Sequence, residues 1–206
     1  TANYFARLAN YFLIFQSLSL PWMLKKIGGR DRKMLTALYT GVVAFDASAS
    51  SSSDWDSVVA EITQKAVDIT SLESLSKDAL GLGTAVRIKA TVTEYVSKAS
   101  GKKNTMIIVP EGYTGDVTFT VELGSIYTAT NAALRDTQTA KTLSNHFTNQ
   151  TEWSQYAKAL NDQSYANVIA PLGIDETIQE KTVTIIGAAT AAGKAVTITP
   201  VSIVIE

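Results

Sequence analysis

Four polar side chains lie close together, directly ahead of a predicted helix: Asn145, His146, Asn149 and Gln150. Amide and imidazole groups beside the free N–H groups of a first helical turn would suit an anion or a polyol. The alternative is a structural role, in which Asn149 and Gln150 satisfy backbone groups around the start of the helix. The residue types favour the structural interpretation, and ligand binding is kept as the functional hypothesis.

Three more polar residues could contact a ligand. Arg135 and Asp136 could hold a carboxylate or sugar hydroxyls by bidentate hydrogen bonding, or could form ion pairs that order the chain around them. Adjacent residues on a helix do not face each other, so we expect these two to have different partners. Asn161, on the next predicted helix, could reach a polar ligand or bond a neighbouring loop. Trp55 and Trp153 could stack on a sugar ring, but their helical spacing with other apolar residues predicts core positions.

The composition excludes several kinds of catalysis. The chain has no cysteine and a single histidine, His146, which removes thiolate chemistry, disulfides and zinc sites with two histidines. Spacing alone pairs no nucleophile or orienting carboxylate with His146. Asp46, Asp54 and Asp56 do not fit a calcium-binding loop and are predicted to be solvated loop and cap residues. We therefore predict a non-enzymatic protein with no catalytic residue, no metal and no cofactor.

The charge is distributed unevenly along the chain. Residues 1–33 carry six basic residues and one acidic residue, whereas the remainder carries 12 basic and 18 acidic. An acidic body of this kind predicts no nucleic-acid partner.

The apolar run at 11–24 is too short to span a bilayer. It would serve as an interfacial anchor, a targeting segment or a packing helix. The first of these predicts peripheral membrane contact through residues 11–33. The predicted division is a segment at 1–33 and one domain at 34–206.

Hydrophobic periodicity predicts the elements of that domain. An extended segment at 35–45 precedes an Ala/Ser linker at 48–53, after which Ser53 or Asp54 caps a helix over 54–67. The later helices are predicted at 71–80, 132–138 and 151–170, the last with Thr151 as its N-cap. Alternation of apolar and polar residues predicts strands at 84–97, 105–109, 117–121, 182–188 and 196–205.

This order of elements predicts an α+β fold. Its centre would be a small antiparallel β-barrel of five strands, OB-like, with a long helix between strands 3 and 4 and further helices at the N-terminus. Closing the barrel would hide the strand edges. An open antiparallel sheet with the helix across one face is the alternative.

Two stretches resemble a known family. One runs from Leu38 to Trp55, and the other from Leu134 to the closing strand. The most specific part is Phe147-Thr148-Asn149-Gln150 followed by Ala159-Leu160-Asn161. Together they resemble a bacterial family of predicted periplasmic lipoproteins, a domain of unknown function whose members are often encoded beside sugar ABC-transporter genes. The family's members begin with a signal peptide that ends in a lipidated cysteine. This sequence has no cysteine, so the resemblance does not carry lipidation over, and the apolar N-terminus would be a substitute anchor.

The resemblance implies a location in the bacterial periplasm or cell envelope. The function it implies is a non-enzymatic accessory or binding module, with carbohydrate uptake as the associated process. Its partner would be a small polar ligand, such as a sugar, or an envelope protein. The alternative function is a structural subunit of an envelope assembly that oligomerises through its N-terminal apolar segment.

Overall fold

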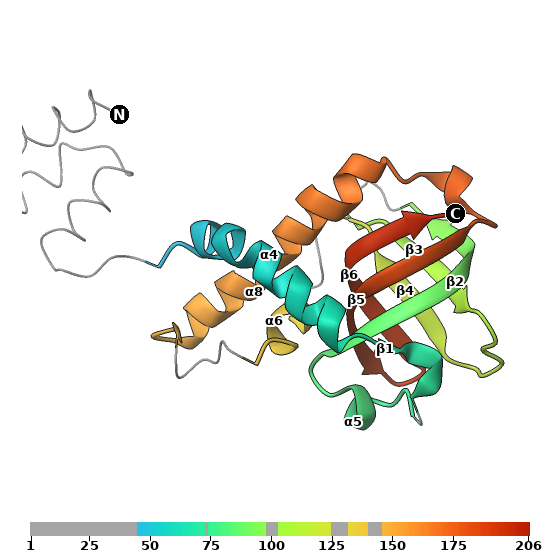
Figure 1. Cartoon of the computed structure of the whole chain (residues 1–206), viewed down its shortest axis with the longest axis horizontal. Helices are drawn as coiled ribbons and strands as arrows, with labels where there is room; N and C mark the ends of the chain where they lie inside the picture. The colour runs from blue at the N-terminus through green and yellow to red at the C-terminus, as the bar shows by residue number, and fades with distance from the viewer. Residues whose placement is uncertain (1–44, 73, 98–102, 125–131, 140–145) are drawn as a thin grey trace, which may run out of the picture. The chain divides into compact units, whose positions relative to one another are not determined.

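The computed structural model describes residues 45–72, 74–97, 103–124, 132–139 and 146–206 (Figure 1). The segment at 1–33, nearly all of the extended segment predicted at 35–45, and Asn145 lie outside the described residues. In the part of the chain described, no helix combines the length and the hydropathy needed to cross a bilayer.

Five strands close into a barrel. They are β2 (Thr84–Val96), β3 (Thr105–Pro110), β4 (Thr118–Glu122), β5 (Thr182–Ala192) and β6 (Ala195–Ile205). The order around the barrel is β2-β3-β4-β6-β5, and antiparallel pairing of β2 with β5 closes it. A two-residue strand, β1 (Val67–Asp68), adds a short parallel pairing to β2.

The barrel is mixed, so the prediction of a purely antiparallel barrel was wrong in one pairing. β4 and β6 run parallel, in register from Thr118 opposite Ala195 to Val121 opposite Ile198. The reason is the position of the last hairpin, because β6 and not β5 lies beside β4. Parallel neighbours require a long connection, and the chain between β4 and β6 contains helices as well as β5.

The inside of the barrel is the main hydrophobic core. Period-2 alternation along β2 buries Val86, Ile88, Ala90 and Val92 while the residues between them are exposed. The other strands contribute equivalent side chains, including Ile108, Phe119, Val121, Ile185 and Ile198. This packing follows directly from the alternation visible in the sequence.

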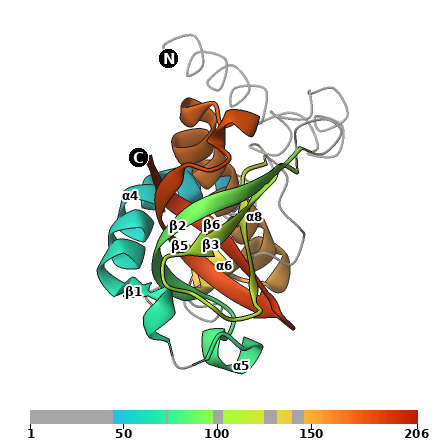
Figure 2. The same ribbon diagram turned by 90° about the vertical axis from the view of Figure 1, so that its right-hand side faces the viewer.

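A second group of buried residues lies outside this core, where helices cover part of the barrel wall. It includes Trp55, Val58 and Ile62 of α4 (Ala47–Lys65) and Tyr156 and Leu160 of α8 (Gln150–Ser164). The two helices pack on each other, and α4 also packs on β2 and β5. Figure 2 shows α4 running along the outside of the strands.

The first long helix begins earlier than predicted. Residues 48–53 are the first turns of α4 and not a linker, and the N-cap is Asp46, whose carboxylate accepts a hydrogen bond from the Ala49 N–H. The serines are compatible with a helix here because several of their hydroxyls bond carbonyls three residues back, as Ser51 does to Ser48. Side-chain bonding of this kind is what makes serine ambiguous in sequence-based prediction.

The other helices also differ at their ends. The helix predicted at 71–80 is two short pieces, η1 (Ile69–Ser71) and α5 (Lys77–Leu80). α6 spans Ala133–Asp136. The helix predicted at 151–170 is α8 followed by a π-helical turn, η2 (Tyr165–Ile169), and a 3-10 turn, η3 (Ala170–Leu172). Another 3-10 turn, η4 (Glu176–Ile178), precedes β5.

Candidate functional site

Arg135 and Asp136 are ion-paired with each other. Arg135 Nε donates to Asp136 Oδ1 at 2.7 Å, with both side chains largely buried. The Arg135 guanidinium carbon also lies 4.2 Å from the centre of the Trp153 ring, and Nη1 donates to the Trp153 carbonyl at 3.2 Å. The expectation of different partners was therefore wrong. α6 is only four residues long, and the long arginine side chain can turn back over its neighbour.

Asn149 is the N-cap of α8, in place of the predicted Thr151. Its Oδ1 accepts a hydrogen bond from the Glu152 N–H at 3.0 Å, and Glu152 Oε2 accepts one from the Thr148 N–H at 2.8 Å. These reciprocal bonds resemble a capping box. The bond from the Thr148 N–H, chief among the causes, lowers the pKa of the Glu152 carboxyl.

The remaining predicted residues are scattered by the fold. His146 and Gln150 are exposed, whereas Asn161 is only 3% exposed within the packed helices. Asn145 is outside the described residues. The structure thus places His146, Asn149 and Gln150 around the start of α8 and Asn161 within the helical packing, and ligand binding by these residues stays a prediction.

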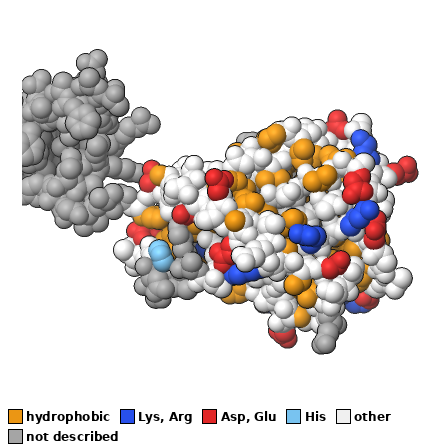
Figure 3. All heavy atoms as spheres, viewed as in Figure 1, with side chains coloured by type: hydrophobic (Ala, Val, Ile, Leu, Met, Phe, Trp, Pro, Cys, Tyr) orange, Lys and Arg blue, Asp and Glu red, His pale blue; other side chains and the backbone are white. Residues whose placement is uncertain are grey.

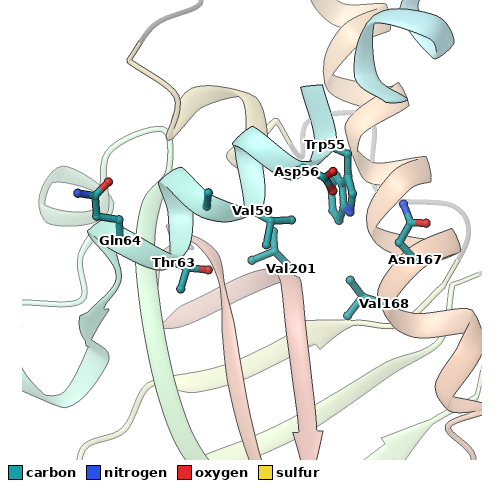
Figure 4. A pocket seen from close by; sticks show the side chains of 9 residues that line it. Trp55, Asp56, Val59, Thr63, Gln64, Asn167, Val168 and Val201 are labelled. Atoms are coloured by element: carbon teal, nitrogen blue, oxygen red, sulfur yellow. The ribbon is translucent and has the colours of Figure 1, made fainter. Parts of the chain in front are cut away.

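A hollow lies elsewhere, between α4, η2 and β6. This groove has a volume of about 500 Å³ and is open to solvent on one side (Figure 4). Nine residues line it: Trp55, Asp56, Val59, Ala60, Thr63, Gln64, Asn167, Val168 and Val201. The space-filling view shows hydrophobic side chains exposed on this face of the barrel (Figure 3). We call this hollow the α4–η2 groove.

The groove combines an apolar floor with polar groups at its rim. Val201 belongs to the outer wall of the barrel, because it is buried but not part of the barrel core. Val59 and Val168 approach from the two helical walls, and Asn167 points from η2 toward α4 (Figure 4). The exposed side chains of Asp56, Gln64 and Asn167 supply a carboxylate and two amides. Binding sites for small molecules have this make-up, with apolar lining and a few polar groups.

The wall that carries Asn167 and Val168 is the π-helical turn η2. In a π turn each backbone hydrogen bond spans five residues instead of four, and such turns are rare and often found at functional sites. Ser164, at its start, donates a hydrogen bond of 2.6 Å to the Pro200 carbonyl of β6. Ile169, at its end, is buried in the barrel core. Both ends of the turn are therefore attached to the barrel, and Asn167 and Val168 between them line the groove.

Sequence reasoning missed this groove. The spacing of Trp55, Val58, Val59 and Ile62 did predict an apolar face on α4. It could not show that Val59 would border a hollow while Val58 and Ile62 were fully buried. Asn167 carried no signal either, because the helical pattern continues across it. In the described part of the chain, no three or more His, Asp or Glu side chains are grouped as metal ligands.

One family model matches the chain, and its description is "Predicted periplasmic lipoprotein (DUF2291)". The match covers residues 24–204 and so begins within the basic, apolar N-terminal segment. It confirms the resemblance found in the sequence and the periplasmic or envelope localisation that the resemblance implied. No curated protein and no solved structure matched the chain.

Proposed function

The chain belongs to this family of predicted periplasmic lipoproteins, and we propose that it is a non-enzymatic, envelope-associated module that binds a small ligand in the α4–η2 groove. The observation that carries the proposal is the π turn. It holds an exposed amide, Asn167, and an apolar side chain, Val168, against the same hollow. A rare backbone conformation that borders a hollow of suitable size supports a binding role.

The chemistry of the lining favours a hydroxyl-bearing ligand with an apolar face. The valines of the floor and the small exposed part of Trp55, which is 9% exposed, offer apolar surface to the apolar face of a sugar ring. Gln64 and Asn167 each offer a donor and an acceptor, which suits hydroxyl groups. A saccharide has both properties, so we propose a role linked to carbohydrate uptake.

We also propose that the barrel is OB-like. The order β2-β3-β4-β6-β5, closed by β2 with β5 and with β4 parallel to β6, supports this description. α8 lies between β4 and β5 in chain order. The barrel type does not by itself define a function. The binding role therefore rests on the groove and not on the likeness of the barrel.

A panel of neutral monosaccharides and disaccharides, screened by thermal shift and then by calorimetry, tests the proposal. A ligand at about one hundred times its dissociation constant should stabilise the folded chain by about 2.7 kcal/mol. Ala60→Phe should abolish that stabilisation, because Ala60 is exposed and borders the groove. Ser57→Phe is the matched control, since Ser57 is an exposed residue of α4 that does not line it.

The outcomes separate the proposed functions. Sugars that bind equally well to Ala60→Phe would place the site elsewhere, and conversion of a bound sugar to product would contradict a non-enzymatic role. If no sugar stabilised the chain, the binding role would lose its support and assembly would become the leading alternative. Deleting residues 1–33 and measuring the molecular mass would then test the assembly role directly.

A further inference from the structure

Asp56 is the one charged residue among the nine that line the α4–η2 groove, all of which are described. Its side chain is exposed on α4, opposite the η2 wall. No lysine or arginine is among the lining residues. A ligand in the groove therefore meets one carboxylate, several neutral polar groups and an apolar floor.

The rest of α4 does not offset this charge near the groove. Its other acidic residues are Asp54, which accepts a hydrogen bond from Tyr156, and Glu61. The basic residue of the helix is Lys65, in its last turn, where it bonds Glu61 at 2.5 Å and the Thr137 carbonyl at 3.2 Å. The α4 wall of the groove thus presents negative charge to a ligand.

We propose that Asp56 sets the charge class of the ligand, so that the groove accepts neutral or positively charged polyhydroxyl molecules and rejects anionic ones such as uronic acids and sugar phosphates. This inference rests on the proposed function, because it concerns the ligand of the same groove. Two like charges about 4 Å apart repel by about 1 kcal/mol even in bulk water, which is about fivefold in affinity. Beside an apolar floor the effective dielectric constant is lower and the discrimination is larger.

A charge series on one sugar ring tests the inference. Once a neutral sugar that binds has been found, its 6-carboxylate and its 2-amino analogue are measured beside it by calorimetry. We expect the amino sugar to bind at least as tightly as the parent. We expect the uronic acid to bind at least about fivefold more weakly. Asp56→Asn should bring the uronic acid to within about twofold of the parent, because it removes the repulsion while keeping the shape of the side chain.

Asp78→Asn is the matched control, since Asp78 is an exposed residue of α5 outside the groove. It should leave the discrimination unchanged. In the unmodified chain, the difference between uronic acid and parent should also shrink as salt is raised, because the Debye length falls from about 10 Å at 0.1 M to about 3 Å at 1 M. This second measurement does not depend on any variant folding correctly.

Two failures are distinguishable. If the parent sugar binds in the groove but the uronic acid binds equally well, or if Asp56→Asn leaves their ratio unchanged, the charge inference is overturned and the proposed function survives. If no neutral sugar binds and an anionic one does so through the groove, the charge inference is overturned and the binding role survives. If no member of the series binds, both are overturned.

Discussion

Tyr156 donates a hydrogen bond of 2.9 Å to Asp54 Oδ2, which joins α8 to α4 across 102 residues of sequence. The Tyr156 side chain is fully buried, with its ring 5.1 Å from that of Phe147 and its hydroxyl 3.3 Å from Gln138 Oε1. Three segments of the helical layer therefore meet at one hydroxyl. Asp54, predicted to be a solvated cap residue, is part of the packing between the two long helices.

Tyr156→Phe should lower the free energy of unfolding by about 1–2 kcal/mol at neutral pH, because it removes a hydrogen bond to a charged group and leaves the ring in place. Burial, and then the bond to Asp54, raises the pKa of the Tyr156 hydroxyl above its ordinary 10.0. This stabilisation is complete below pH 10.0 and is lost as the pH rises toward the folded-state pKa. Urea unfolding at about pH 7 and about pH 11 should show the unmodified chain losing more stability than the variant. Equal losses would contradict the role of this hydroxyl.

Asn149→Ala should cost about 1 kcal/mol of stability, because the N-cap bond to the Glu152 N–H is lost. Asn149→Asp should retain most of that stability, since aspartate caps a helix equally well. Gln150→Ala is the control, because Gln150 is exposed in the first turn of the same helix. Chemical denaturation measures all three. A loss for Gln150→Ala as large as that for Asn149→Ala would refute the capping assignment.

The elements that depend on local pattern could be predicted from the sequence, and the groove could not. The strand predicted at 84–97 is observed at Thr84–Val96, because alternation of burial is a local property of a strand in a barrel wall. The sequence predicted Thr151 as the N-cap of α8, whereas the structure has Asn149 there. The two residue types have similar capping preferences, so the pattern alone did not separate them. The π turn around Asn167 leaves no mark on hydrophobic periodicity. It is attached through Ser164 to a strand that follows much later in the chain.

Arg135→Lys should lower the free energy of unfolding, although it keeps the positive charge. The planar guanidinium lies 4.2 Å from the centre of the Trp153 ring while bonding Asp136 and the Trp153 carbonyl, and an ammonium cannot reproduce that fork. We expect the free energy of unfolding to fall by about 1–2 kcal/mol, because the variant loses both the cation–π contact and a hydrogen bond. A double-mutant cycle with Trp153→Leu should give a coupling of about 0.5–1 kcal/mol, and zero coupling would show that the stacking contributes nothing. Sugar affinity should be unchanged, because neither residue lines the groove.

Ser164→Ala should affect stability and ligand binding together. The Ser164 hydroxyl donates a hydrogen bond to the Pro200 carbonyl. Pro200 lies where the pairing of β5 with β6 is irregular, and it directly precedes Val201 of the groove floor. Removing a buried donor should cost about 1–3 kcal/mol. It should also release the start of the π turn, so that Asn167 and Val168 are held less firmly and the dissociation constant rises. Ser154→Ala, at an exposed position of α8, should change neither quantity. Calorimetry well below the unfolding temperature separates the effect on binding from the effect on stability. If the variant is less stable but its dissociation constant is unchanged, the groove wall does not depend on this bond.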